Sequence, residues 1–523
     1  MRFSSKLFGL GVVITGLAAS SGIAMASATD VYIAQSAAGA NNGSSCANAR
    51  AYSFFNSGAN WGSGTTQIGP GTTVHLCGTF TAAAGASGYL VFQGNGTSGS
   101  PVTLLFESGA ALTAPYWGGN GAIYASGASY ITIDGGSNGT IRATANGTAL
   151  TYQKEGGAGM RFDGCSNCEV RNLTIANLYV HTTNLSDTNG DIYALQWIDG
   201  SNVSMHDNTI HDAGWCAYYA FTGSGRSNVS IHDNTIYNCN GSIVVGSGNT
   251  GASVSGVSIY GNTLHDSVNW DDSADSNHHD GVHLWAVHSG SSWSNVQIYN
   301  NYFYGDWGIH TTGQIFIEAN GGGTGTGSNA IYNNLMTASN AAAHALTNGN
   351  ISLQANGWYV VNNTFVNDSN GGTGGGAIQA DSGTGATVMN NILMASSTAI
   401  NFPSGTSITS GDYNDYYNIG TSIPFIYAGR SYSDFSTFRS GSSLDAHSLT
   451  SNPNLDSTGK PQTSSPVIGA GTNLSALCPL FTGLCADMAG TPRPATGAWA
   501  MGAYSAGQAQ TLIPPTLSVL AVQ

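Results

Sequence analysis

The sequence predicts an all-β protein that coils into a right-handed parallel β-helix, and three observations support this prediction. A short strand, a turn with asparagine and a second short strand recur along the chain, as in "VSMHDNTIHD" (203–212) and "VSIHDNTIYN" (229–238). The copies follow one another at a period near 28 residues, which is typical of solenoid architectures. Glycine supplies 73 of the 523 residues and only 7% are charged, a composition that suits many short strands and turns.

The asparagine of the turn recurs in seven aligned copies. Successive members lie 26, 28, 39, 33, 29 and 28 residues apart: Asn208, Asn234, Asn262, Asn301, Asn334, Asn363 and Asn391. One coil cannot bury its own apolar face, so coils stacked at ~4.8 Å would build a continuous core. An inward asparagine at each turn could then bond the turn backbone and its stacked neighbours. The variable coil length favours a right-handed helix over left-handed hexapeptide repeats, and the coils have too few strands for propeller blades.

The two ends of the chain differ from these coils. Arg2 and Lys6 precede the apolar run "LFGLGVVITGLAA" and a set of small residues, which is typical of a secretory signal peptide. This run is short for a transmembrane helix, so we expect no stable membrane span. We therefore predict a signal peptide at 1–28, an entry segment and first coils at 29–120, β-helix repeats at 121–425, a closing segment at 426–507 and a tail at 508–523. The protein should be secreted or displayed at the cell surface.

Eight cysteines support export into an oxidising compartment. They fall into four local pairs, which we predict as disulfides: Cys46 with Cys77, Cys165 with Cys168, Cys216 with Cys239, and Cys478 with Cys485. Their spacing does not match a paired C-x-x-C zinc site.

The balance of charge limits the partners. The formal net charge is −15, and Lys154 and Lys460 are the two lysines that remain after the predicted signal peptide. Nucleic-acid binding depends on lysine and arginine, so we expect no nucleic-acid partner. No phosphate-binding or dinucleotide motif stands in a suitable context, so we expect no nucleotide either. The expected partner is a polysaccharide, and the expected state is a monomer.

The I-x-x-N-x-x-I/F coils from about 168 to 395 resemble the right-handed parallel β-helix proteins of the pectate-lyase-like superfamily. The stretch "DVYIAQSAAGANNGSSC" (30–46) resembles their entry segment, and the run from "SSPVIGAGTNLS" to "GAWAMGAYS" (464–505) resembles their closing segment. The resemblance implies the fold and a carbohydrate-active protein. It leaves the reaction open, because this fold hosts lyases, hydrolases, isomerases and adhesins.

The longest step between asparagines contains the acidic stretch "NWDDSADSNHHDGVHLW" (269–285). Strand alternation predicts that Val282 and Leu284 point inward, whereas Gly281, His283 and Trp285 point outward. His279 and His283 would lie about 13 Å apart on this strand, too far to chelate one zinc ion. The preceding aspartates offer oxygen ligands, so calcium is the candidate metal. Its candidate ligands are Asp271, Asp272 and Asp275.

The register of the repeat places two more carboxylates beside this strand. His283 should stand in line with Phe316, Ser352 and Gln379, and Trp285 in line with Glu318, Gln354 and Asp381. Glu318 and Asp381 would then be two coils apart, about 9.6 Å, near the upper limit for an inverting glycosidase. We predict a catalytic group in which Asp280 or His283 is the acid/base and Glu318 and Asp381 are partner carboxylates. Trp285 would stack on a sugar.

Outward rings also form columns. One runs through Arg171, His206, His232, Tyr260, Tyr299 and Tyr332, and another through His211, Tyr237, His265 and Tyr304. His232, Tyr260 and Tyr299 are candidate polymer-binding residues, although such stacking also stabilises a β-helix without a ligand.

Lys154 and Arg161 are candidate substrate-binding cations that could stabilise a carboxylate during β-elimination. A structural pair between Lys154 and Glu155 is the alternative.

The sequence thus predicts a secreted enzyme that cleaves an extracellular polysaccharide by glycoside hydrolysis or by β-elimination. The alternative is a non-catalytic, adhesin-like surface protein that binds glycans.

Overall fold

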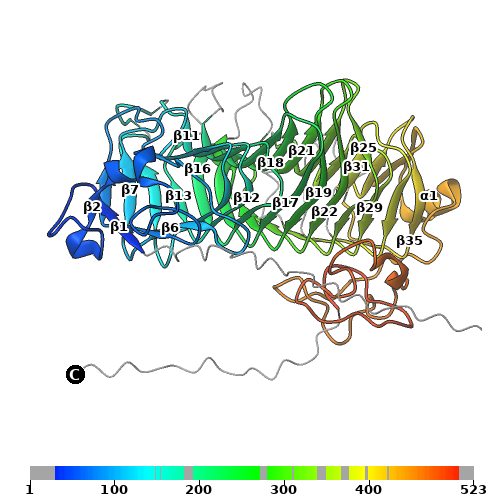
Figure 1. Ribbon diagram of the computed structural model, residues 1–523. Helices are drawn as coiled ribbons and strands as arrows, with labels where there is room; N and C mark the ends of the chain where they lie inside the picture. The colour runs from blue at the N-terminus through cyan, green and yellow to red at the C-terminus, as the bar shows by residue number, and fades with distance from the viewer. Residues whose placement is uncertain are drawn as a thin grey trace, which may run out of the picture.

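The structure is a computed structural model that describes residues 30–147, 149–153, 155–181, 192–270, 279–308, 311–337, 349–366, 376–394, 398–420 and 423–505. This chain forms the predicted right-handed parallel β-helix, which runs from the blue N-terminal end to the yellow end in Figure 1. The predicted signal peptide, the tail beyond residue 507, Lys154 and the candidate calcium ligands Asp271, Asp272 and Asp275 lie outside the described residues.

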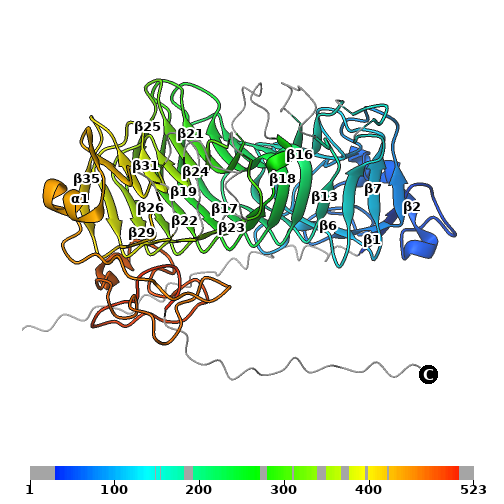
Figure 2. The same ribbon diagram turned by 180° about the vertical axis from the view of Figure 1, so that it is seen from behind.

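Sheet A forms one side of the coil and pairs its strands in parallel, as Figures 1 and 2 show from opposite sides. Its strands in spatial order are β2 (Arg50–Ala51), β1 (Val31–Ala34), β3 (Thr73–Cys77), β6 (Val102–Phe106), β9 (Ser129–Asp134), β12 (Ser166–Arg171), β15 (Val203–His206), β17 (Arg226–His232), β19 (Ser253–Tyr260), β22 (Ser292–Tyr299), β26 (Asn329–Tyr332), β29 (Trp358–Val361), β32 (Ala386–Met389) and β35 (Ile408–Asp412), with β25 (Thr324–Thr326) beside β22.

Two further sheets complete the coil and share the long strands β16 (Thr209–Phe221) and β18 (Thr235–Ser247). Sheet B adds β4 (Thr79–Thr81), β7 (Ala111–Ala114), β10 (Thr140–Ala143), β13 (Thr174–Ala176), β20 (Thr263–His265), β23 (Tyr302–Tyr304), β27 (Leu335–Thr337), β30 (Thr364–Val366), β33 (Ile392–Met394) and β36 (Asp415–Tyr417). Sheet C adds β11 (Ala158–Asp163), β14 (Tyr193–Ile198), β21 (Asp280–Ala286), β24 (Gly313–Ala319), β28 (Ile351–Leu353), β31 (Ile378–Ala380), β34 (Ile400–Phe402) and β37 (Phe425–Tyr427).

Short elements close the two ends of the coil. β5 (Leu90–Val91) pairs with β8 (Ile123–Ser126), and β38 (Arg430–Tyr432) returns antiparallel to β37. Helix α1 (Phe435–Ser442) follows, with Asp434 accepting from the Thr437 amide as its N-cap. Short 3₁₀ turns are η1 (Cys46–Asn48), η2 (Tyr52–Phe54), η3 (Gly58–Asn60), η4 (Val268–Trp270) and η5 (Ser475–Leu477).

The seven asparagines form the predicted ladder inside the coil. Each side-chain amide donates to the Oδ1 atom of the asparagine one coil further on, at 2.9–3.1 Å. The backbone amide of each asparagine donates to the same Oδ1 atom. The structure adds an eighth member, Asn414, which accepts from Asn391 and donates to Asp445 Oδ1 at 3.0 Å. Buried amides are thereby paired at each of these coils, which stabilises one register.

The closing segment packs against the outer side of the later coils, where it appears in orange and red in Figure 1. Its Phe481, Leu484 and Trp499 share a buried cluster with Tyr299 and Tyr332 of sheet A.

The buried Arg493 stabilises the contact between the closing segment and sheet A. Its guanidinium donates to Asn333 Oδ1 at 2.9 Å and to the Gly502 carbonyl at 3.0 Å. Burial lowers the pKa of Arg493 to about 10.

All four predicted disulfides are confirmed. Among the described residues, no helix is long and apolar enough to cross a membrane.

Candidate functional site

An aromatic group lies on the outer face of sheet C, where two glycines of β18 make room for it. Gly241 pairs with Asp280 and Gly246 pairs with Trp285 across the β18–β21 contact. A methyl group on Gly241 would overlap Trp215, and one on Gly246 would overlap the Trp285 indole. Each indole therefore lies over a glycine, which explains why β18 carries glycine where its neighbours carry bulky groups.

The rings contact one another across this floor. Trp285 packs edge-on against Trp215 at a centroid distance of 5.9 Å and lies 6.1 Å from Tyr218. Tyr193 of β14 extends the group at 4.9 Å from Tyr218. Trp285 is partly exposed, and its indole nitrogen donates to the Ser247 carbonyl at 3.2 Å. Such a surface can stack on the apolar face of a sugar ring.

Three titratable side chains line up next to Trp285. His283 Nε2 lies 3.2 Å from Glu318 Oε2, and His283 Nδ1 lies 3.4 Å from Asp280 Oδ2. Exposure rises along this row: the Asp280 side chain is 0% exposed, His283 3% and Glu318 17%. The rings of His283 and Phe316 stack at 4.8 Å, which fixes the imidazole plane. Glu318 is therefore the member of the row that a polymer can reach.

Asp280 is positioned by a bend that strand alternation did not predict. A Cβ atom added at Gly281 would lie against Phe303, so this position faces the core and not the outside, as had been expected. Asp280 accepts a hydrogen bond from the Gly313 amide at 3.0 Å. Desolvation raises its pKa well above the ordinary value, and the charge of Glu318 raises it further. The expectation that Asp280 contacts substrate is therefore corrected: it lies behind His283.

The predicted register beyond this strand is confirmed. His283 pairs with Phe316, Phe316 with Ser352, and Ser352 with Gln379. Trp285 pairs with Glu318 in the adjacent outward column.

Asp381 follows Ala380 at the end of β31, two coils beyond Glu318, and is exposed. Ser352 Oγ donates to one oxygen of Asp381 at 3.0 Å and Gln379 Nε2 to the other at 3.3 Å.

The predicted cation Arg161 lies on the same face but away from this row. Its column runs through Gln196, Tyr218 and Val244 before it reaches His283. Four coil steps correspond to about 19 Å. Arg161 is also held by Asp163, with Nε 2.9 Å from Oδ1. It therefore does not share a binding position with His283.

No group of three or more His, Cys, Asp or Glu side chains gathers as a metal site within the part of the chain that the structure describes. The calcium prediction rests on Asp271, Asp272 and Asp275, outside that part, and stays a prediction.

The ring column on sheet A is continuous, but it is open over only part of its length. His206, His232, Tyr260, Tyr299 and Tyr332 stack with centroids 4.6–4.9 Å apart. Tyr299 is only 6% exposed and Tyr332 is 0% exposed, because the closing segment covers them. The expectation that Tyr299 binds a polymer is therefore corrected, since sequence alternation does not reveal what packs on a strand from outside. Tyr260 and His232 remain partly exposed.

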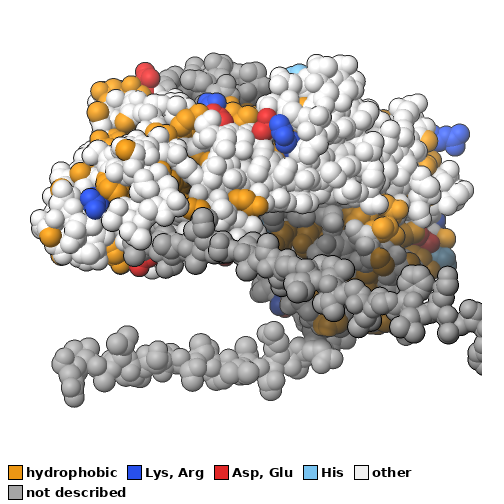
Figure 3. Space-filling model, in the orientation of Figure 1, with side chains coloured by type: hydrophobic (Ala, Val, Ile, Leu, Met, Phe, Trp, Pro, Cys, Tyr) orange, Lys and Arg blue, Asp and Glu red, His pale blue; other side chains and the backbone are white. Residues whose placement is uncertain are grey.

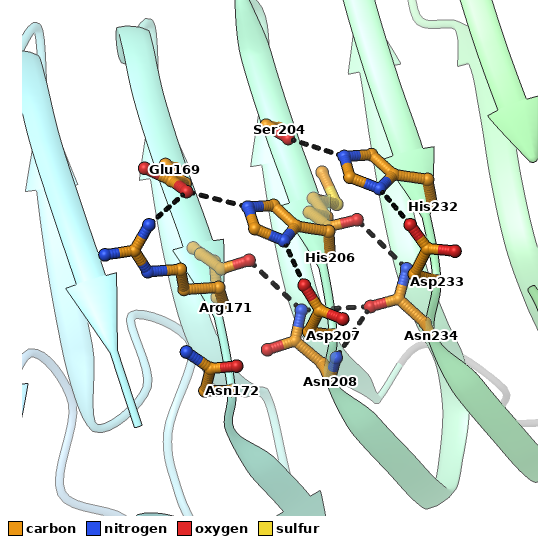
Figure 4. Close-up of polar contacts among 12 residues, drawn as sticks. Glu169, Arg171, Asn172, Ser204, His206, Asp207, Asn208, His232, Asp233 and Asn234 are labelled. Carbon is orange, nitrogen blue, oxygen red and sulfur yellow. Dashed lines mark hydrogen bonds and ion pairs between the residues drawn. The ribbon is translucent and has the colours of Figure 1, made fainter. Parts of the chain in front are cut away.

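A polar network surrounds the open end of this column (Figure 4). His206 and His232 each place Nδ1 against the aspartate that follows, at 2.6 Å to Asp207 and 2.8 Å to Asp233. The Nε2 atom of His206 lies 2.7 Å from Glu169, and that of His232 lies 3.3 Å from the hydroxyl of Ser204. Sequence reasoning treated these histidines only as rings and missed Ser204.

Sequence reasoning also missed Trp215, Tyr218 and Tyr193. The signal was present: "YALQWI" (193–198) and "GWCAYYAF" (214–221) carry aromatic residues at the outward positions Tyr193, Trp215 and Tyr218, and the next strand has glycine at 241 and 246.

Comparisons with known proteins show similarity to solved structures but do not assign an activity to this chain. The sequence matches no protein-family model and no curated protein. Among solved structures it is similar to pectate lyase Pel9A, with 13% identity over 92% of this chain and 98% of that chain and a TM-score of 0.40.

Two further similarities are weaker. The family PL6 alginate lyase AlyGC is 12% identical over 69% of this chain and 51% of that chain, with a TM-score of 0.36. A family 28 exopolygalacturonase from Yersinia enterocolitica is 12% identical over 65% of this chain and 73% of that chain, with a TM-score of 0.34.

Proposed function

We propose that this protein is a secreted glycoside hydrolase that cleaves a neutral extracellular polysaccharide across the outer face of sheet C, with inversion at the anomeric carbon. The observation that carries the proposal is the placement of Glu318 and Asp381. They lie two coils apart along one face, about 9.6 Å at ~4.8 Å per coil. This spacing, taken from the rise of the coils, lies at the upper limit of the ~6.5–9.5 Å at which inverting hydrolases hold an acid and a base with a water molecule between them.

Glu318 takes the role of general acid in this proposal. It stands at the exposed end of the row Asp280–His283–Glu318. Burial raises the pKa of Asp280 well above its ordinary value. The imidazole of His283 lies between the carboxyl groups of Asp280 and Glu318, so it can pass a proton from one to the other. Asp280 and His283 are therefore positioning residues, and Glu318 is the group that would touch the glycosidic oxygen.

Asp381 takes the role of general base. Hydrogen bonds from Ser352 and Gln379 fix both of its oxygens, which orients the carboxylate that would activate water. Trp285, backed by Trp215 and Tyr218, would hold a sugar ring one coil before Glu318.

The sign of the charge supports a neutral polymer. Lysine and arginine are sparse on the surface shown in Figure 3, and the net charge of the chain is −15. An anionic polymer would meet repulsion there unless cations intervened. The four disulfides support export, since such bonds persist in oxidising compartments.

A polysaccharide panel tests the proposal. We expect new reducing ends without ultraviolet absorbance from an unsaturated product, and proton NMR of early products should show the inverted anomer. Glu318→Gln and Asp381→Asn should each lower the rate about 100-fold or more. The control is Glu155→Gln, an exposed carboxylate on another part of the chain, which should leave the rate unchanged.

Each other outcome contradicts the proposal in a distinct way. Unsaturated products would indicate β-elimination. Polymer binding without cleavage by any panel member would favour the non-catalytic, glycan-binding alternative.

A further inference from the structure

We infer that Ser204, His232 and Asp233 form a second catalytic site, on the outer face of sheet A, that hydrolyses short acyl esters such as O-acetyl groups. The Ser204 hydroxyl lies 3.3 Å from His232 Nε2, and His232 Nδ1 lies 2.8 Å from Asp233 Oδ2. Figure 4 shows these contacts side by side. A nucleophile bonded to a base, and the base bonded to an orienting carboxylate, is the arrangement that activates serine.

The base of this site is held rigidly. His232 is sandwiched between His206 and Tyr260, with both ring centroids 4.6 Å away and interplanar angles of 4° and 3°. The backbone of Asp233 has a positive φ of 53° at the corner of the coil, a conformation that aspartate tolerates better than most residues. The imidazole is thus presented to Ser204 through Nε2 and anchored through Nδ1, as a general base requires.

The preceding coil shows why Ser204 is the reactive member. One coil earlier, Glu169 occupies the column of Ser204 and His206 occupies the column of His232. The pair Glu169–His206 therefore has the same arrangement as the pair Ser204–His232. There the histidine meets a carboxylate at 2.7 Å instead of a hydroxyl. The negative charge of Glu169 beside Ser204 is balanced by Arg171, at 2.9 Å. The column therefore combines one salt-bridged histidine with one histidine that faces a nucleophile.

The reaction balances with water as the second substrate. Ser204 Oγ bonds to the acyl carbon while its proton passes to His232 Nε2. The ester C–O bond then breaks, and the leaving alcohol takes that proton. Water adds to the acyl carbon and gives a proton to His232, after which Ser204 Oγ leaves with that proton and a carboxylic acid is released. Ser230 pairs with Ser204 on the next strand, so its hydroxyl is the candidate donor to the oxyanion in this proposal.

The sheet face determines which acyl groups fit. Ser204 and His232 are partly exposed on a face shared with the stacked rings, without an enclosing wall from their own strands. A long acyl chain would stay in water there, whereas an acetyl group needs no such pocket. Two sources carry this group: an O-acetylated polymer and a small acetyl ester.

The test uses the full chain, a fluorophosphonate probe and two substrates. The probe should label Ser204, as located by peptide mass spectrometry. Acetate release should be measured from an O-acetylated polysaccharide and, separately, from triacetin, so that the two sources are distinguished. Ser204→Ala should abolish labelling, and both Ser204→Ala and His232→Asn should reduce acetate release about 100-fold or more.

Ser258→Ala is the matched control. Ser258 occupies the same outward column, but its neighbour diagonally across the next strand is Tyr299 instead of a histidine. It should change neither labelling nor release. The inference is overturned if the probe does not label Ser204, if neither ester is cleaved, or if Ser204→Ala and Ser258→Ala behave alike. Loss of glycoside cleavage would not bear on it, because Glu318 lies on a different sheet.

Discussion

The ring column of sheet A has two halves with the same stacking, of which one is buried and the other is partly exposed. In the covered half, Tyr299 and Tyr332 lie beneath Phe481 and Leu484 of the closing segment and belong to a buried cluster. In the open half, His206, His232 and Tyr260 keep the same spacing but remain partly exposed. Repetition of a coil therefore sets where a ring stands, and a later segment of the chain decides whether that ring is core or surface.

The charged side chains of the ring column are found in its open half. The open half carries Glu169, Arg171 and two His–Asp pairs, all linked by ion pairs or hydrogen bonds. The covered half replaces the histidines with tyrosines, and the hydroxyl of Tyr332 donates to the Thr482 carbonyl of the closing segment. Burial of a histidine with its aspartate would cost more than burial of tyrosine, because charged groups lose their hydration.

The largest expected effect concerns a buried carboxyl on β36, at the C-terminal end of the coil. Asp415 is fully buried, its backbone forms an isolated β-bridge with Leu449, and desolvation raises its pKa to about 7. Since this exceeds the unfolded value, the contribution of Asp415 to stability is complete below about pH 4 and is lost as pH rises through 7, a fall of about 4 kcal/mol. Asp415→Asn should remove this fall, as measured by chemical denaturation from pH 4 to 8. An unchanged pH slope would contradict the assignment.

The next effect compares the two halves directly. Tyr332→Ala should lower the free energy of unfolding by about 3 kcal/mol, because it empties a fully buried site. Tyr260→Ala, on the partly exposed side, should cost about 1 kcal/mol. Thermal and urea unfolding of both variants measure the difference. Equal losses would mean that the closing segment does not stay docked in solution.

The smallest expected effect concerns Trp285 on the open face of sheet C. Gly246→Ala should displace the Trp285 indole, which occupies the place of the added methyl group. With the proposed substrate we expect KM to rise about tenfold while kcat changes little, since a binding surface is moved and not the carboxylates. Gly119→Ala is the control, because its added methyl group would meet no atom within 4 Å. A fall in kcat without a change in KM would argue against Trp285 as a stacking surface.

Much of this architecture could be predicted from the sequence, because the spacing of a repeat determines which residues of successive coils lie side by side. The ladder from Asn208 to Asn391, the alignment of Trp285 with Glu318 and the disulfides all follow from spacing. The covering of Tyr299 could not be predicted, since it depends on residues more than 150 positions away that carry no repeat signal.

Local geometry accounts for the other differences. Strand alternation would turn Asp280 inward with Val282, whereas the bend at Gly281 turns it toward His283, where it stays buried. Ser204 was missed because its partner His232 lies diagonally across to the next strand, whereas alignment of the coils compares only residues directly opposite.

The asparagine ladder also has a direction. Within the row, one N–H of each side-chain amide donates to the asparagine on its C-terminal side, and the amide oxygen faces the N-terminal side. The dipoles of these bonds along the row therefore add instead of cancelling, as they do along an α-helix. The positive pole of this row arrives at Asp445, an acceptor, which acts on the row as an acidic cap acts on a helix. A coil can therefore be inserted into this protein only if its asparagine continues the same polarity, and reversal at one position would leave two buried donors face to face.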